Sequence, residues 1–329
     1  MRMLRVLLIV IGAALAVLPL QGQTTPVVVT ANPLLDDLVR SLAGEAVTTH
    51  CLLPAGVRYR DYEPSSDDAR ALSNAALLVV NGIELEPSLE ALSSEAGFSG
   101  QVVVAGEGFP LLNTEGELQD PETEPGTDQG VPDPYAWHDP RNVRTYVQTI
   151  ALALRDLVPA QAAEIDARLK VYLQQLDAAH AYAEEQLAPL TGPRRVLATS
   201  LDFLGYFAHA YQFQLVAVPG PGAGLQPATP AAQLLADGYK QLGSPAVFVP
   251  ADAGSRTLRF IAAESDVAIV ASLSEGPGIG ETYLRTFRNN VDAIAKALRP
   301  VDPQDPLQPE PLNPIMHESP PSTEPAERE

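Results

Sequence analysis

Short runs of apolar residues alternate with longer amphipathic segments along most of this chain. Runs such as Val-Val-Val at 27–29 and Leu-Leu-Val-Val at 77–80 are typical of buried strands. The segments between such runs place apolar residues three and four positions apart, which is typical of helices packed against a sheet. Because strand and helix follow one another with short links, the pattern predicts parallel strands covered by helices, and we expect an α/β protein.

Helix caps and turn residues set the predicted boundaries. Asn32 is a good N-cap, Pro33 suits a first helical turn, and Gly44 is expected to end the same helix. Ser65 or Ser66 should cap the next helix. The predicted strands cover 27–30, 46–53, 76–82, 102–104, 195–199, 215–218, 246–249 and 267–270, and the predicted helices cover 33–44, 66–72, 86–96, 143–157, 160–187, 201–211, 229–242, 255–263 and 281–298.

Two segments break the alternation. Residues 113–132 are rich in acidic residues, proline, threonine and glycine, and this composition predicts a mobile surface loop. Residues 160–187 form an unusually long amphipathic segment, with Ile165, Tyr172 and Leu176 on its apolar face. We interpret this long segment as a connector helix between two lobes.

The ends of the chain differ from its middle. The N-terminus has a short basic start, an apolar run and then small residues, which is the layout of a secretory signal peptide. The C-terminus is rich in proline and acidic residues and is expected to be disordered. The predicted parts are a signal peptide at 1–23, an N-terminal α/β lobe at 24–158, a connector helix at 159–190, a C-terminal α/β lobe at 191–298 and a tail at 299–329.

Composition limits the location and the partners. The formal net charge of −20 over 329 residues argues against a nucleic-acid partner, because phosphates repel such a surface. Cys51 is the only cysteine, so no intrachain disulfide is possible. No cysteine follows the small residues of the predicted signal peptide, and no second apolar run is long enough to span a bilayer. We expect a periplasmic monomer without a membrane span after cleavage.

The segment 133–142, Asp-Pro-Tyr-Ala-Trp-His-Asp-Pro-Arg-Asn, joins the acidic loop to the helical segment that follows. It contains Trp137, the only tryptophan, close to Tyr135 and His138. Each proline of its two Asp-Pro pairs favours extended or turn backbone at the residue before it. We therefore predict a rigid corner where the first half of the chain meets the second.

Several motifs together resemble the zinc/manganese solute-binding proteins of ABC importers, the cluster A-I class. The corner resembles that family's Asp-Pro-His-x-Trp-x-Asp-Pro-x-Asn, and Tyr-Glu-Pro at 62–64 resembles its His-x-Tyr-Glu-Pro region. Asn-Gly at 81–82, Leu-Glu at 85–86 and Phe-Leu-Gly-Tyr-Phe at 203–207 are similar to further family segments. The resemblance implies two α/β lobes joined by one long connector helix, and an importer permease as partner. The sequence shows no nucleophile elbow or phosphate loop, so we do not expect an enzyme.

The positions that hold the cation in the family carry other residues here. The resemblance implies three histidines and a carboxylate at the lobe junction, and the corresponding positions are Arg60, Tyr135, Leu201 and Ala271. Leucine and alanine offer no lone pairs, arginine stays charged and repels a dication, and tyrosine ligates only when deprotonated. We therefore predict a degenerate metal site, with zinc or manganese bound only if other side chains supply the ligands.

Other interpretations of these positions stay open. In one, Arg60 stands where the cation would be and pairs with Asp61, Glu63 or Asp202 across the cleft. In another, the cleft takes a small anionic or polar ligand, with Tyr135 as a hydrogen-bonding partner, or the protein binds a partner without transporting a ligand. Arg60 as a solvated loop charge, and Tyr135 as a packing partner of Trp137, are the purely structural alternatives.

His138 is the histidine nearest to the predicted cleft. It would ligate a shifted metal or, more simply, hold the corner through hydrogen bonds. No two histidines show close ligand spacing, so the sequence defines no new metal cluster. The candidate cleft-lining residues are Arg60, Tyr135, His138 and Asp202.

Overall fold

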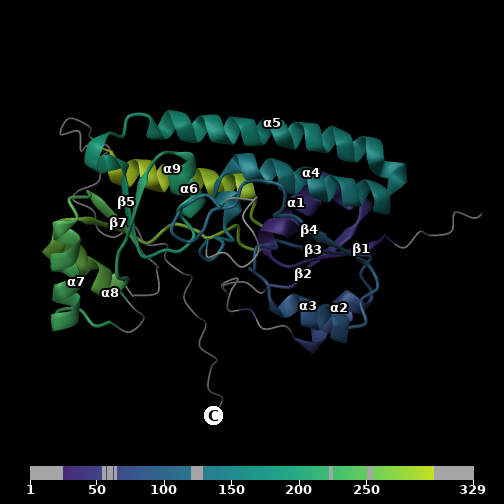
Figure 1. Cartoon of the computed structure of the whole chain (residues 1–329), viewed down its shortest axis with the longest axis horizontal. Helices are drawn as coiled ribbons and strands as arrows, with labels where there is room; N and C mark the ends of the chain where they lie inside the picture. Colours follow the sequence, from purple (N-terminus) through teal and green to yellow (C-terminus); the bar gives the residue numbers. More distant parts are fainter. Residues whose placement is uncertain are drawn as a thin grey trace, which may run out of the picture.

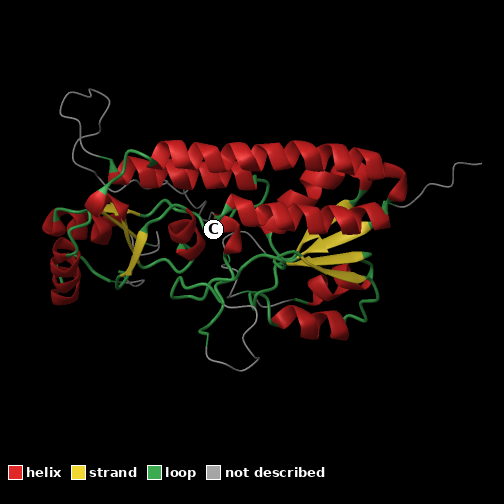
Figure 2. Cartoon of the chain, turned by 45° about the horizontal axis from the view of Figure 1, so that its top comes forward, coloured by secondary structure: helices red, strands yellow, loops and turns green. Residues whose placement is uncertain are grey.

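Two α/β lobes lie side by side along one long helix in the computed structural model of the chain (Figure 1). The structure describes residues 25–53, 57, 62, 65–119, 129–221, 225–249 and 255–299. The predicted signal peptide, Arg60 and the tail beyond residue 299 lie outside these residues. Figure 2 shows the two sheets at opposite ends of the molecule, each flanked by helices, which confirms the predicted fold class.

The first lobe is built on a parallel sheet in the order β2-β1-β3-β4. Its strands are β1 (Val27–Thr30), β2 (Thr48–Cys51), β3 (Leu77–Val80) and β4 (Gln101–Val104). Helices α1 (Pro33–Ala43) and α4 (Pro140–Leu157) lie on one side of this sheet, and α2 (Ser66–Ser73) and α3 (Ser88–Glu95) on the other (Figure 1). The central strands β1 and β3 read as continuous apolar runs because helices cover both of their faces.

The second lobe repeats this arrangement. Its parallel sheet has the order β6-β5-β7-β8, with β5 (Val196–Thr199), β6 (Gln214–Ala217), β7 (Ala246–Phe248) and β8 (Ala268–Val270). Its helices are α6 (Gly205–Ala210), α7 (Pro230–Gln241), α8 (Ser255–Ser265) and α9 (Tyr283–Leu298). In the first sheet β1 therefore lies next to β3, and in the second sheet β5 lies next to β7. The ends of these central strands face the region between the lobes.

Helix α5 (Ala162–Leu187), of 26 residues, is the long connector that the sequence predicts. It packs on α1 and α4 of the first lobe and on α9 of the second (Figure 1). Its buried stripe includes Ile165, Tyr172, Leu176 and Leu187. Each helix in the described part of the chain is either too short or too polar to span a bilayer.

Local capping explains most helix boundaries. The Asn32 side chain accepts a hydrogen bond from the backbone N–H of Leu35 at 3.1 Å, and Gly44 ends α1 with a positive φ of 58°. Ser65 caps α2 in a capping box with Asp68. Short 3-10 turns, η1 (Gly44–Ala46), η3 (Ala136–His138), η4 (Pro159–Gln161) and η5 (Gly192–Arg195), occupy several of the links.

Two predicted helices begin at other residues. Helix α4 begins at Pro140 rather than residue 143, because Asp139 caps it by accepting the N–H of Arg141 at 2.9 Å. Helix α6 begins at Gly205 rather than residue 201. The Thr199 hydroxyl accepts the N–H of Leu201 at 2.9 Å, and this bond holds the chain in a loop after β5.

The described ends of the acidic loop are tied together by Asn113. Its side-chain oxygen accepts the N–H groups of Glu115 and Glu117, and its amide donates to the carbonyl of Gln129 at 3.0 Å. Asn113 also forms an isolated β-bridge with Pro132. The loop therefore leaves and rejoins the first lobe at one point, while residues 120–128, within the predicted mobile segment, lie outside the described residues.

Candidate functional site

The corner 133–142 is held in one conformation by its own side chains. The Asp133 carboxylate accepts the N–H of Tyr135 at 2.8 Å, which is an Asx turn. At the other end, the Arg141 guanidinium donates to both oxygens of Asp139 at 2.8–3.0 Å. The side chain of Asn142 donates to the carbonyl of Ala136 at 3.1 Å. These local bonds account for the rigidity that the two Asp-Pro pairs predict.

A buried polar network fixes the corner to the first lobe. The Asn81 amide donates to the carbonyl of Pro134 at 3.1 Å, and the Tyr146 hydroxyl donates to the Asn81 side-chain oxygen at 2.7 Å. Beneath them, the Glu86 carboxylate accepts the N–H groups of Asn81 and Gly82. Burial raises the pKa of Glu86 to about 7. The corner is thereby attached to the carboxyl end of β3.

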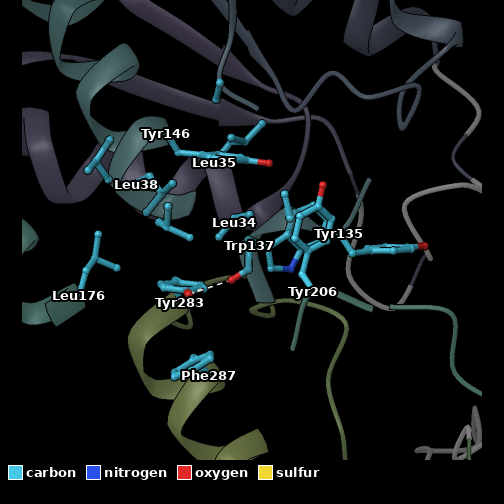
Figure 3. Packing of buried hydrophobic residues seen from close by; sticks show 14 of the residues in the cluster. Leu34, Leu35, Leu38, Tyr135, Trp137, Tyr146, Leu176, Tyr206, Tyr283 and Phe287 are labelled. Carbon is cyan, nitrogen blue, oxygen red and sulfur yellow. Dashed lines mark hydrogen bonds between the residues drawn. The ribbon is translucent and has the colours of Figure 1, made fainter. Parts of the chain in front are cut away.

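Aromatic packing fixes the corner to the second lobe. The rings of Tyr135 and Trp137 meet edge-to-face at 5.3 Å, and the Tyr135 ring also contacts that of Phe203 at 6.2 Å. The His138 ring stacks on Phe203 at 5.0 Å. Tyr135 is 2% exposed and Trp137 is 1% exposed. Figure 3 shows Tyr135 and Trp137 among the packed side chains, with Tyr206 and Tyr283 nearby.

One carbonyl group, that of Glu275, receives two hydrogen bonds from the corner. The Trp137 indole N–H donates to it at 2.8 Å, and His138 Nε2 lies 2.9 Å from the same oxygen. Because a carbonyl only accepts, Nε2 of His138 carries a hydrogen in this arrangement. Glu275 follows β8 in the second lobe, so these bonds join the two lobes directly.

The protonation of His138 follows from its burial. The side chain is buried, and desolvation lowers its pKa to about 4. The ring is therefore neutral at physiological pH, with the hydrogen on Nε2 and a lone pair on Nδ1. Its observed role is that of a donor and stacking partner, which is the hydrogen-bonding alternative expected from the sequence.

The structure brings together only some of the positions at which the resemblance implies cation ligands. Arg60 lies outside the described residues, so its pairing with Asp202 is untested. Tyr135 and the half-buried Leu201 belong to one hydrophobic cluster that extends across both lobes, whereas Ala271 packs against a second cluster inside the C-terminal lobe. The Asp202 side chain is exposed.

Two further histidines and the cysteine can also be placed. His180 Nδ1 lies 3.0 Å from the Tyr211 hydroxyl, so it is a satisfied packing residue, and His209 is exposed on α6. Cys51 is half-buried, and burial raises the pKa of its thiol to about 11, which disfavours a reactive thiolate. Within the described ranges, no three side chains of His, Cys, Asp or Glu gather in a way that could hold a metal ion.

Sequence reasoning missed Glu275, because only its main-chain oxygen takes part and no side-chain type signals such a role. It also missed the contact between the two ends of the chain at Tyr283. The Tyr283 N–H donates to Asp37 Oδ2 at 2.8 Å, and its hydroxyl donates to the carbonyl of Trp137, shown dashed in Figure 3. Tyr283 thus links α1, the corner and α9.

The family model described as "Zinc-uptake complex component A periplasmic" matches residues 27–297. The chain belongs to this family. The match covers both sheets, the corner and the connector helix, so it rests on the whole bilobal scaffold.

The names of similar proteins refer to zinc, to manganese or to metal in general. The zinc-binding protein TroA of Treponema pallidum is 27% identical over 283 residues, which covers 83% of this chain and 89% of that protein. The manganese-binding lipoprotein MntA of Halalkalibacterium halodurans is 27% identical over 279 residues, covering 82% and 88%. The metal ABC transporter substrate-binding lipoprotein ScbA of Streptococcus cristatus is 24% identical over 282 residues, again covering 82% and 88%.

Solved structures show the same fold. The crystal structure of ZnuA superposes with a TM-score of 0.69 at 22% identity, covering 84% of this chain and all of that chain. The Mn-bound periplasmic metal-binding protein of Candidatus Liberibacter asiaticus superposes with a TM-score of 0.65 at 19% identity, covering 83% of this chain. The zinc-uptake family to which the chain belongs is one of solute-binding proteins.

Proposed function

We propose that this protein is the extracytoplasmic solute-binding component of an ABC importer of the metal class, and that its own interlobe site lacks the family's cation ligands. The proposal that the cation ligands are missing rests on the surroundings of Tyr135. The sequence resemblance implies a histidine at this position, and the ring of Tyr135 is packed between Trp137 and Phe203. A phenol that lies in an aromatic cluster is poorly placed to become the anionic ligand that a dication needs.

The importer role rests on the scaffold and on the relatives. The relatives named above include a substrate-binding lipoprotein of a metal ABC transporter, and the alignments cover 88% of the two relatives ScbA and MntA. A permease that receives the loaded protein is therefore the expected partner. The formal charge of −20 makes nucleic acid an unsuitable partner. The signal-peptide layout at 1–23 supports export, and we propose the periplasm as the location.

The chemistry of the remaining positions supports the same conclusion. Leu201 and Ala271 carry only hydrocarbon side chains and donate no electron pair to zinc or manganese. Arg60, by its fixed positive charge, would repel a dication at that place. His138 is the nearest imidazole, yet its Nε2 hydrogen is directed at the Glu275 carbonyl. With one free nitrogen, His138 supplies at most a single ligand.

The first experiment is a metal measurement on the purified full chain. We expect elemental analysis to find far less than one equivalent of zinc or manganese. We also expect that adding either ion, after treatment with EDTA, leaves the melting temperature unchanged. One equivalent of either metal, lost on chelation and restored on titration, would overturn the degenerate-site half of the proposal and leave the importer role standing.

The second experiment rebuilds the site. The variant Arg60→His, Tyr135→His, Leu201→His, Ala271→Asp should bind zinc, and zinc at 100 times its Kd should stabilise the fold by about 3 kcal/mol. The matched control keeps Ala271 and carries only the three histidines, so it should bind zinc more weakly. If neither variant gains zinc affinity, these positions are not those of the family's ligands.

A small anionic or polar ligand is the alternative outcome of these tests. It would be indicated by a metal-free wild-type protein whose melting temperature rises with a small anion in a way that depends on Arg60. The Arg60→Gln variant, assayed with the same anions, separates this case from a protein that binds a partner and no small ligand.

A further inference from the structure

A cavity of about 560 Å³ lies where α1, α5 and the beginning of α9 meet, and none of its lining residues belongs to the corner. Helix α1 contributes Asp37 and Ser41, α5 contributes Arg168, Tyr172 and Gln175, and α9 contributes Leu284. Its volume falls within the range of small-molecule sites, about 300–1,000 Å³. The three elements come from both lobes and the connector, so a molecule bound here would touch every rigid part of the protein.

Tyr172 shows that this cavity has an unmet polar group. The residue is 5% exposed, and its buried hydroxyl has no hydrogen-bond partner among the described residues. A buried hydroxyl without a partner is costly, and native structures usually satisfy it. Burial raises the pKa of Tyr172 well above its ordinary value, so the hydroxyl stays neutral and is able both to donate and to accept.

The two charged groups of the cavity are a carboxyl and a guanidinium. Asp37 is 8% exposed, and its Oδ2 accepts the N–H of Tyr283. Arg168 is half-buried, and its Nη1 donates to the carbonyls of Leu42 and Ala43 at the end of α1. Within the part of the chain that the structure describes, no carboxylate lies in ion-pair contact with Arg168. Its guanidinium therefore lies against the carbonyl end of α1, where a positive charge is favourable.

We propose that this cavity binds a small zwitterion of the dipeptide class, with the ligand carboxylate on Arg168 and its ammonium on Asp37 and Tyr172. An arginine presents paired N–H groups that fit a carboxylate, and an aspartate with a phenol oxygen accepts from an ammonium. Ser41 and Gln175 add polar side chains to the cavity lining, and Leu284 offers an apolar wall for a side chain.

The spacing of Arg168 and Tyr172 along α5 selects among zwitterions. Arg168 and Tyr172 lie one turn apart on the same face of α5, about 6 Å along the helix axis. An extended dipeptide spans about 7 Å between its termini, whereas a single amino acid spans about half of that. A dipeptide is therefore long enough to extend from Arg168 to Tyr172. This proposal is independent of the metal site and holds whether or not the interlobe cleft takes a cation.

The test is calorimetric titration of the full chain with the dipeptide Ala-Leu in the presence of EDTA, which removes any contribution from metal. N-acetyl-Ala-Leu lacks the ammonium, and Ala-Leu amide lacks the carboxylate. We expect saturable one-site binding of Ala-Leu, and at least about tenfold weaker binding of each blocked peptide, since each loses one charge-assisted contact. No saturable binding of Ala-Leu at millimolar concentration overturns the proposal.

Variants assign each end of the ligand. Asp37→Asn should remove the preference for Ala-Leu over its acetylated form, and Arg168→Gln should remove the preference over the amide. Tyr172→Phe should weaken Ala-Leu without changing the fold, because it deletes one oxygen. Arg168→Lys keeps the charge and should retain part of the affinity. Lys170→Gln, exposed on the same helix, is the matched control and should bind as the wild type does.

The ratios of affinity between Ala-Leu and its two blocked forms test the proposal even if a variant is less stable. If Ala-Leu binds but Asp37→Asn and Arg168→Gln keep both preferences unchanged, the peptide is bound elsewhere and the proposal is wrong. Melting temperatures of each variant without peptide identify any loss of fold, and Tyr172→Phe and Arg168→Lys then carry the test.

Discussion

The hydroxyl of Tyr283 donates a hydrogen bond of 2.8 Å to the main-chain carbonyl of Trp137, although 146 positions separate the two residues in the sequence. Trp137 lies in the corner between the halves, and Tyr283 begins the last helix. Trp137 in turn donates its indole N–H to Glu275, which precedes Tyr283 by only a short segment. The two bonds form a closed loop of contacts that fixes the position of one lobe on the other.

The first prediction concerns this bond. Tyr283→Phe keeps the ring but leaves the buried Trp137 carbonyl without this donor, so the free energy of unfolding should fall by about 1–3 kcal/mol. Urea denaturation measures the change. Tyr182→Phe is the matched control, because the Tyr182 hydroxyl bonds Asp292 at an exposed position, and its loss should cost less than about 1 kcal/mol. Equal losses in the two variants would contradict the proposed role of Tyr283.

The second prediction is a pH dependence at His138. Burial lowers its pKa from 6.5 to about 4, so the folded protein keeps the ring neutral where the unfolded chain binds a proton. Its contribution to stability is complete above about pH 6.5 and is lost as the pH falls toward 4, by roughly 3 kcal/mol. His138→Gln removes this titration, so the stability difference between wild type and variant should shrink over that window. Urea denaturation at each pH measures this difference. If the wild type and His138→Gln lose stability by the same amount as the pH falls, the prediction is wrong.

The third prediction is a pH dependence of stability at Asp37, with the opposite sign to that at His138. Burial raises the pKa of Asp37 from 3.8 to about 6, despite the N–H bond from Tyr283. The stability that comes with its protonated form is present below pH 3.8 and is lost as the pH rises through 6. Asp37→Asn should therefore gain stability relative to the wild type as the pH rises across that range, by up to about 3 kcal/mol. Denaturation in urea between pH 4 and pH 7 checks this, and a constant difference would show that Asp37 does not titrate in this range.

The fourth prediction compares two helical glycines. At Gly205, the first residue of α6, a Cβ atom would overlap Oδ2 of Asp133, the carboxylate that holds Tyr135 in place. At Gly238, inside α7, a Cβ atom would meet no heavy atom within 4 Å. Gly205→Ala should therefore lower the melting temperature, whereas Gly238→Ala should stabilise the fold by about 0.5–1 kcal/mol. The same sign for both variants would rule out this account of Gly205.

Local chemistry made much of the fold predictable. Helix α1 begins after Asn32 at Pro33 and ends at its C-cap Gly44, as these residue types predict. The alternation of strand and helix predicted the two parallel sheets. The long apolar stripe through Ile165 and Tyr172 gave the connector helix. These features depend on residues close in sequence, and hydrogen bonds within a few positions express them directly.

The site was less predictable for a physical reason. Main-chain atoms do not reveal their partners in the sequence, and the Glu275 carbonyl is the acceptor that joins the lobes. The start of α6 depended on whether Thr199 would bond Leu201, a choice that residue type alone does not settle. The contact between Asp37 and Tyr283 spans 246 positions and required the tertiary structure.

Helix α5 has a consequence for how the length of this chain can vary. Inserting one residue near its middle would advance everything beyond it by about 1.5 Å and turn it by about 100°. Every side-chain pair on the far half would then face the wrong partner, and the second sheet would be carried out of line with the first. An insertion between Gln119 and Gln129 has no such effect, because Asn113 joins the flanks of that segment. Residues can accordingly be gained or lost at the loop, while the residue count of the helix is fixed.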